Sequence, residues 1–256
     1  MIEFKDVKII INKKMIVEKM SFKVEDNKIC CVFGLNGSGK TTVLRAINGL
    51  TEYTGEILIN DQNIKTLKNL KKAQMIAYFP QQLPHVKDIS VRDLVSFGRM
   101  PYNRYTNKLS QVDQNIITKA LEQLQINDLS DRLVDTLSGG EKQKVFFAML
   151  LAQDANNILL DEPMNNLDIN NRQVLLDYLQ LLKKAGKTVI VVLHEITEMM
   201  RVADEILIIH NVNNKKVYHY FKSKEDFINS GLLEKYYNLK LINFEKENLY
   251  IPVKCQ

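Results

Sequence analysis

The sequence predicts an α/β fold built around a mostly parallel β-sheet. Strand-like apolar runs alternate with helical stretches from residue 158 to residue 209, which is the alternation typical of parallel β-α-β units. A glycine-rich turn joins an apolar run at 29–33 to a helical stretch at 42–50, and a purely helical stretch at 83–135 interrupts the strands. We therefore expect a single domain, 1–256, with a helical unit inserted into its core.

The first part of the core is expected at 1–82. Short strands are predicted at 9–11, 20–24, 29–33, 56–59 and 76–79. Pro80 and Pro84 then break the extended pattern.

The helical subdomain is expected at 83–135. Ser90 and Asp93 have the spacing of a capping box. Farther on, apolar residues fall on one helical face: Ile116, Ala120, Leu121 and Leu124.

The second part of the core is expected at 136–214, followed by a short C-terminal extension at 215–256. In this part, strands are predicted at 158–160, 189–193 and 206–209, between helices at 140–153, 172–184 and 197–203. The extension is predicted to contain a short strand, a small helical pair and a closing extended piece.

Composition excludes several classes of protein. The 256 residues are 45% hydrophobic and 25% charged, as in a globular protein, and the formal charge of +5 is spread without the basic block of a nucleic-acid-binding tail. Cys30, Cys31 and Cys255 form no CxxC pair, which favours a reducing compartment, with the first two expected in a buried strand. The N-terminus lacks the pattern of a signal peptide. Apolar runs such as 189–193 are too short to span a bilayer, so any membrane function requires partner chains.

The strongest chemical signal is GLNGSGKTT at 34–42, which follows an apolar strand and precedes a helix. Its glycines let the backbone wrap around phosphate oxygens, while N–H groups and the helix N-terminus supply partial positive charge. Lys40 adds a full charge near the β and γ phosphates, and Thr41 is expected to ligate Mg²⁺. We call this segment the phosphate loop; its residues are Gly34, Leu35, Asn36, Gly37, Ser38, Gly39, Lys40, Thr41 and Thr42.

Two acids follow the apolar run at 158–160. A Mg²⁺ ion that bridges phosphates needs a carboxylate at the end of a neighbouring buried strand, and Asp161 is the candidate. Glu162 would point the other way along an extended chain and is the candidate general base that polarises an attacking water. Alone, the pair could be surface acids at a strand end, but the phosphate loop favours the catalytic interpretation.

The segment LSGGE at 137–141 supports two interpretations. Ser138 and Glu141 have the S-x-x-E spacing of an ordinary capping box. A cap does not need the paired glycines Gly139 and Gly140, which would let a ligand phosphate approach the helix N-terminus. Since one phosphate loop already serves one nucleotide, a second anion site suggests a nucleotide held by another copy of the chain.

With the phosphate loop, LSGGE and the strand-end Asp-Glu in this order, the chain resembles the ATPases of ABC transporters over nearly its whole length. The resemblance implies a P-loop NTPase core, an N-terminal antiparallel β subdomain, ATP and Mg²⁺ as cofactors, and ATP hydrolysis. It also implies that Gln81 contacts Mg²⁺ and water, that His194 contacts the γ phosphate, and that Asp168 lies in a loop crossing the dimer interface. The residues Met164-Asn165-Asn166 depart from the commoner small-residue version of that loop.

One position departs from the family pattern. Related sequences place an aromatic residue that stacks on adenine upstream of the phosphate loop, where this chain has Ile11. Because isoleucine lacks an aromatic face, we hypothesise loose discrimination between ATP and other nucleotides.

Within the family, several segments resemble the ATPases of iron-siderophore importers and of their haem and cobalamin relatives: 79–82, 91–95, 98–102, 132–141 and 148–154. The resemblance implies a homodimer on the cytoplasmic face of the membrane, two integral-membrane permease subunits and an extracytoplasmic substrate-binding protein. The segment 97–105, with Arg99, Tyr102, Arg104 and Tyr105, either lines a groove for a permease helix or is a solvated loop. The alternatives are an exporter subunit and a non-transport ABC ATPase acting on nucleic acid or ribosomes, although no nucleic-acid partner is expected.

Overall fold

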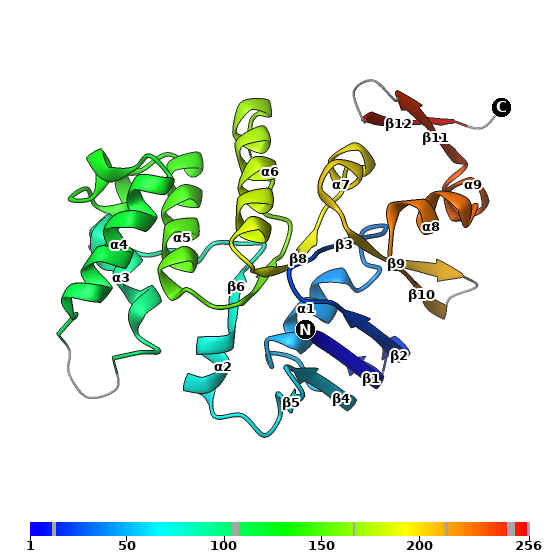
Figure 1. Cartoon of the computed structure of the whole chain (residues 1–256), viewed down its shortest axis with the longest axis horizontal. Coiled ribbons are helices and arrows are strands. Elements are labelled where there is room, and N and C mark those ends of the chain that lie inside the picture. The colour runs from blue at the N-terminus through cyan, green and yellow to red at the C-terminus, as the bar shows by residue number, and fades with distance from the viewer. Residues whose placement is uncertain (12–13, 104–107, 166, 213–214, 245–248, 255–256) are drawn as a thin grey trace.

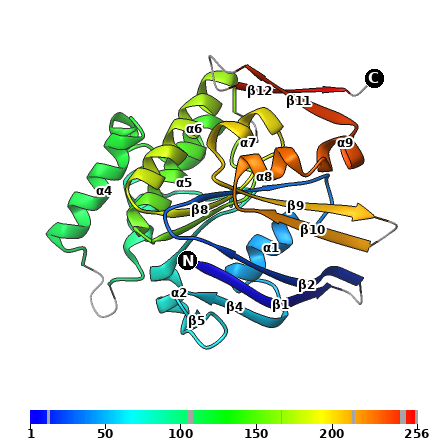
Figure 2. The same cartoon turned by 45° about the vertical axis from the view of Figure 1, so that its right-hand side comes forward.

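The computed structural model describes residues 1–11, 14–103, 108–165, 167–212, 215–244 and 249–254. These residues form three β-sheets with helices around them, as Figures 1 and 2 show from two directions. The strands are β1 (Ile2–Ile11), β2 (Lys14–Val24), β3 (Ile29–Phe33), β4 (Thr54–Ile59), β5 (Gln62–Asn63), β6 (Ile76–Phe79), β7 (Asn157–Leu160), β8 (Thr188–Val192), β9 (Glu205–Val212), β10 (Lys215–Phe221), β11 (Leu239–Phe244) and β12 (Leu249–Lys254).

The helices include every predicted helical stretch, with ends shifted by up to three residues. They are α1 (Lys40–Ile47), α2 (Asn69–Met75), α3 (Val91–Ser96), α4 (Gln111–Gln123), α5 (Gly139–Gln153), α6 (Ile169–Lys184), α7 (Ile196–Val202), α8 (Lys224–Asn229) and α9 (Leu232–Tyr237). Short 3₁₀ helices lie at Phe97–Arg99, Asn127–Leu129 and Val134–Thr136. Among the described residues, no helix is both long and apolar enough to cross a bilayer.

The central sheet has the strand order β10-β9-β3-β8-β7-β6. All its strands are parallel except β10, which pairs antiparallel with β9. Strands β3, β7 and β8 are buried along their whole length, which explains their continuous apolar sequences. The mostly parallel α/β core is therefore confirmed.

A second sheet, β2-β1-β4-β5, is antiparallel throughout and confirms the predicted N-terminal β subdomain. It packs on one face of the central sheet together with α1. Alternation along β3 places Cys30 and Val32 in that core, while Ile29, Cys31 and Phe33 face the helices on the other side. Both cysteines are buried, as expected.

The inserted helices α3 and α4 pack against α5 at one end of the molecule (Figure 1). Ser90 accepts a hydrogen bond from the backbone N–H of Asp93 at the start of α3, and Ser110 with Asp113 forms a full capping box on α4. The buried face of α4 is centred one residue from the predicted position: Ile117 is buried and Ile116 only partly so.

Arg99 corrects one expectation about this region. Its guanidinium is buried, with Nε donating to Asp113 Oδ1 at 2.8 Å and Nη1 donating to the carbonyl of Ala152 at 2.8 Å. Tyr102 packs its ring on the guanidinium. Arg99 therefore fastens the segment to α4 and α5 and is not a surface contact for a permease, whereas Arg104 and Tyr105 lie outside the described residues.

After the central core, the chain forms the predicted strand, helical pair and extended piece. The strand β10 is the edge of the central sheet, and the extended piece is a β11–β12 hairpin whose β12 contacts α7. Tyr237 of α9 packs its ring near Phe33, at the end of the strand that leads into the phosphate loop.

Candidate functional site

The candidate site lies at the carboxyl ends of the parallel strands, where the connections after β3, β6, β7 and β8 meet. This edge is the usual ligand site of open α/β sheets. A cavity of about 640 Å³ opens there, within the size range of small-molecule sites. Its lining includes nine predicted site residues: Asn36, Gly37, Gly39, Lys40, Thr41, Thr42, Gln81, Glu162 and His194.

The phosphate loop approaches its neighbours so closely that side chains are excluded. A Cβ on Gly34 would overlap the carbonyl oxygen of Ile209, and Gly37 and Gly39 have φ angles of +75° and +109°, which glycine adopts without strain. The loop forms a cradle whose size suits phosphate oxygens. Leu35 is exposed and Ser38 is buried; neither contributes to the cavity lining.

Lys40 begins α1 and is buried, with Nζ donating to the carbonyl oxygens of Gly34 at 2.9 Å and Leu35 at 3.2 Å. Burial lowers the pKa of Lys40, and the negative charges of Glu162 and Asp161 partly oppose that shift. Its ammonium group thus lies inside the loop, beside the space that the glycines leave open.

Asp161 and Thr41 bring two oxygen donors together. Thr41 Oγ1 donates to Asp161 Oδ1 at 2.9 Å, and Tyr78 donates its hydroxyl to Asp161 Oδ2 at 3.2 Å. Burial raises the pKa of Asp161, although these two hydrogen bonds favour the ionised form. A hydroxyl and a carboxylate beside a phosphate cradle fit the hard-oxygen preference of Mg²⁺.

The geometry of Glu162 differs from the extended chain that the sequence suggested. Its φ of +50° turns the backbone immediately after β7, so Glu162 and Asp161 serve the same cavity instead of pointing to opposite faces. This left-handed conformation is costly for a residue with a side chain, and such strain is typical of functional sites.

Three side chains hold the Glu162 carboxylate. His194 Nε2 lies 2.8 Å from Oε1, and the amide nitrogens of Gln81 and Asn165 donate to Oε2 at 2.6 Å and 2.7 Å. Burial raises the pKa of Glu162, but the hydrogen bonds from His194 and Asn165 outweigh it and leave the pKa below its ordinary value. The carboxylate therefore stays ionised, as a group that accepts a proton from water must be.

Four contributors to the site escaped sequence analysis: Ile16, Tyr78, Asn165 and Lys216. Asn165 had a signal, because it lies three residues after Glu162, and the turn after a strand end brings such residues together. Ile16, on β2, lines the cavity, whereas Ile11 is 38% exposed on β1 and does not belong to the lining. The apolar wall near the loop is therefore Ile16.

The LSGGE segment begins α5 outside this cavity. Ser138 and Glu141 form a capping box, and the hydrogen bonds from Ser138 lower the pKa of Glu141. A Cβ on Gly139 or Gly140 would meet nothing within 4 Å. Packing within the chain thus gives no reason for either glycine, and the helix entrance is open.

Asp168 is also outside the cavity, where it caps α6. Its two carboxylate oxygens accept from the backbone N–H and the side-chain amide of Asn171 at 2.8 Å and 2.9 Å. Asn166, in the same loop, lies outside the described residues.

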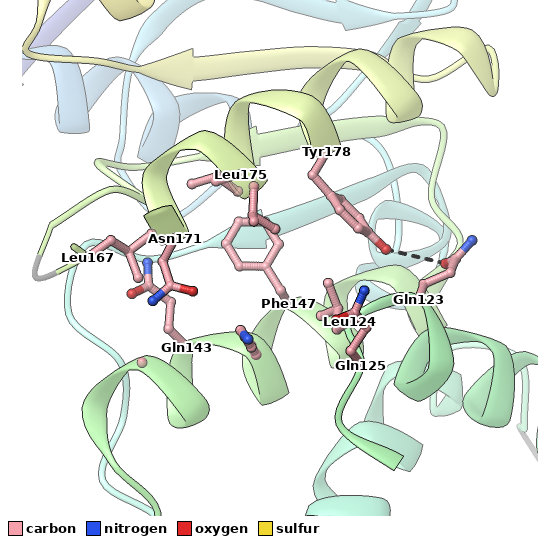
Figure 3. Close-up of a pocket in the computed structure, with 12 residues that line it drawn as sticks. Gln123, Leu124, Gln125, Gln143, Phe147, Leu167, Asn171, Leu175 and Tyr178 are labelled. Atoms are coloured by element: carbon pink, nitrogen blue, oxygen red, sulfur yellow. Dashed lines mark hydrogen bonds between the residues drawn. The ribbon is translucent and has the colours of Figure 1, made fainter. Parts of the chain in front are cut away.

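A separate apolar pocket lies between α4, α5 and α6 (Figure 3). Phe147 and Leu175 line it, and Tyr178 donates to Gln123 Oε1 at 3.4 Å across it. Gly140 and Leu167 also line this pocket. The starts of α5 and α6 are thereby neighbours at the junction between the helical unit and the core.

Comparison with known proteins places these features in one family. A sequence model of the family described as ABC transporter matches residues 17–165, more than half of the chain. The achromobactin transport ATP-binding protein CbrD of Dickeya dadantii is 35% identical over 77% of this chain and 74% of its own length. The petrobactin import ATP-binding protein YclP of Bacillus subtilis is 32% identical over 94% of both chains. A solved structure described as an inward-facing metal-chelate type ABC transporter has a TM-score of 0.79 at 22% identity, over 98% of this chain and 97% of its own.

Proposed function

Because the chain belongs to the ABC transporter ATP-binding family, we propose that it is the ATP-hydrolysing subunit of an importer for iron chelates of the siderophore type. The chain is an ATPase of the ABC type, and the cargo is the part of the proposal that goes further. The observation that best supports the assignment of catalytic residues is the Glu162 carboxylate, fixed by His194, Gln81 and Asn165 at the edge of the phosphate cavity.

In the proposed mechanism, Lys40 leaves the carbonyls of its own loop and binds the β and γ phosphates of ATP. Thr41 and Asp161 hold Mg²⁺, together with Gln81. When bound, the ion neutralises charge that develops on the phosphates. The ionised Glu162 orients a water and accepts its proton, while His194 lies where it can contact the γ phosphate.

The second anion site supports action as a pair. Ser138, Gly139, Gly140 and Glu141 lie outside the phosphate cavity of their own chain, with an open helix N-terminus. In a homodimer this helix end would face the nucleotide held by the partner, with Asp168 in the loop between the two copies. Each ATP would then require both chains.

The permease contact is proposed on the helical subdomain. Phe97, Met100 and Tyr102 are exposed on the segment that Arg99 anchors from below, and Leu133 is exposed nearby in the chain. Apolar side chains with a fixed backbone are suited to receive a helix from a membrane subunit. Such docking would hold the ATPase at the cytoplasmic face of the membrane, with a substrate-binding protein on the opposite side.

The hydrolytic proposal is tested by Glu162→Gln. The variant keeps the hydrogen-bonding size of the side chain but cannot accept a proton, so we expect turnover to fall at least about a hundredfold while ATP still binds. It should also accumulate as an ATP-bound dimer, detectable by size-exclusion chromatography. The matched control is Glu122→Gln, an exposed residue of α4. Normal turnover in Glu162→Gln would reject the assigned role.

The cargo is tested by uptake of ferric siderophores in cells that lack the gene. The wild-type chain, expressed with the permeases encoded beside it, should restore uptake, whereas Glu162→Gln should not. Restored export of the chelate, or ATPase stimulation by RNA or DNA instead of by the permeases, would favour the alternative functions.

A further inference from the structure

Lys216 brings a second ammonium group to the phosphate cavity. It lies on β10, far in sequence from the phosphate loop, and its Nζ donates to the carbonyl oxygen of Gly37 at 2.9 Å. The same nitrogen would lie 3.5 Å from a Cβ on Gly39, and Lys216 is part of the cavity lining. Lys40 holds the first residues of the loop and Lys216 holds its middle.

The sheet register explains why β10 reaches this point. The last residue of β3, Phe33, pairs with Ile208 on β9, but β9 continues to Val212 before the chain returns along β10. The hairpin therefore extends beyond the end of β3, where the phosphate loop begins. Lys216 pairs with Asn211 in this overhanging part.

Strand order separates the two ends of the cavity. Gln81, Glu162 and His194 follow β6, β7 and β8, which all lie on one side of β3, whereas β9 and β10 lie on the other side. The reacting γ phosphate must lie toward Glu162. A nucleotide held in the loop therefore has its sugar end toward β10, where Lys216 and Ile16 are found.

We propose that Lys216 binds the α phosphate of the nucleotide, so that this subunit recognises the sugar end of its ligand through charge. The inference rests on the proposed ATP site. A lysine ammonium has three N–H donors, so the bond to Gly37 is compatible with a bond to a phosphate oxygen. Ile16, which contacts the Gly39 position from the opposite strand, supplies apolar surface beside the ammonium.

This arrangement has a kinetic consequence. The α phosphate is not altered when the γ phosphate is transferred to water, so its contact is equally strong in the ground state and the transition state. Loss of such a contact raises KM and leaves kcat nearly unchanged. Because the α phosphate is common to ATP and GTP, both nucleotides should lose affinity by the same factor.

The experiment is equilibrium binding of ATP, ADP and GTP to the full chain, at several salt concentrations, for the wild type and Lys216→Met. We expect about tenfold weaker binding of all three nucleotides, consistent with loss of one charge-assisted hydrogen bond. The salt dependence of binding should become shallower because one cation is gone. Lys216→Arg should restore affinity, and the KM of the variant should rise without a comparable fall in kcat.

The matched control is Lys222→Met, which removes the same charge from an exposed residue just after β10. Wild-type affinity in Lys216→Met would overturn the proposal. Loss for only ATP or only GTP would also overturn it, since the contact would then be with the base. So would weaker binding with an unchanged salt dependence and no rescue by arginine, which would indicate that Lys216 only braces Gly37. If the wild type binds no nucleotide, or Lys40→Ala binds as well as the wild type, the proposed ATP site itself fails.

Discussion

Replacement of Asp113 by alanine should destabilise the helical subdomain strongly. The side chains of Arg99 and Asp113 are only 7% and 6% exposed, and Arg99 Nε lies 2.8 Å from Asp113 Oδ1. Asp113 also completes the capping box of α4 by accepting from the backbone N–H of Ser110 at 3.0 Å. The substitution would therefore leave a buried cation without its partner and would remove a helix cap.

The magnitude follows from these two losses. Breaking a buried ion pair from one side costs about 3–5 kcal/mol, and loss of an N-terminal cap costs about 1 kcal/mol. Because the two effects share one carboxylate, we expect about 4 kcal/mol for Asp113→Ala, a large part of the stability of a typical domain. Ser110→Ala, which loses only the cap, should cost about 1 kcal/mol.

The assay is urea unfolding followed by circular dichroism, with Arg99→Met combined with Asp113→Ala as the third variant. The double variant buries no unpaired charge, so it should be more stable than Asp113→Ala alone. A cost below 1 kcal/mol for Asp113→Ala, or a double variant that is less stable than the single one, would refute a buried pair. Burial opposes ionisation of Asp113, yet the hydrogen bonds from Ser110 and Arg99 lower its pKa to about 2. The stabilisation should thus be complete above the ordinary value of 3.8 and be lost as pH falls toward 2.

Three further predictions concern other elements. Gly139→Ala should leave the isolated chain at least as stable, because a Cβ there meets nothing and alanine favours helix, but should abolish ATPase activity of the dimer; normal activity would leave only the capping role. Gly98→Ala should lower the midpoint of thermal unfolding, by about 1–3 kcal/mol in free energy, because a Cβ would overlap the carbonyl of Met149; an unchanged midpoint would contradict this packing. Burial, and repulsion by His219 and Lys235, lower the pKa of His210, and the pKa of His219 is lowered likewise. Stability should therefore be complete above pH 6.5 and fall as pH drops through the lowered values, and His210→Phe should flatten this dependence in unfolding curves measured from pH 5 to 8.

The sequence predicted most of the strands because parallel, fully buried strands are written as uninterrupted apolar runs. The strand at 29–33 and the strand at 76–79 agree with β3 and β6 residue for residue. The start of α1 was predicted two residues late, because the glycine turn and Lys40 look like loop until the phosphate cradle is seen. Local patterns thus identify the elements well.

Sequence patterns could not reveal what depends on tertiary register. Lys216 reaches the phosphate loop only because β9 extends past β3, which no local motif encodes. Arg99 looked like one cation of an exposed groove, since nothing in its neighbourhood announces a buried partner at Asp113. The turn at Glu162 depends on a positive φ that is rare for glutamate, so an extended chain was the natural expectation.

The two anion-facing segments of the chain are joined through one buried side chain. Gln143, one turn into α5 from the LSGGE glycines, donates its side-chain amide to the carbonyl of Pro163, the residue after Glu162. Because Gln143 is only 8% exposed, loss of this bond would leave a buried amide unsatisfied. A displacement of α5 must therefore either carry the Glu162 loop with it or break this bond. The helix that faces the partner's nucleotide is in this way mechanically connected to the carboxylate that serves the chain's own nucleotide.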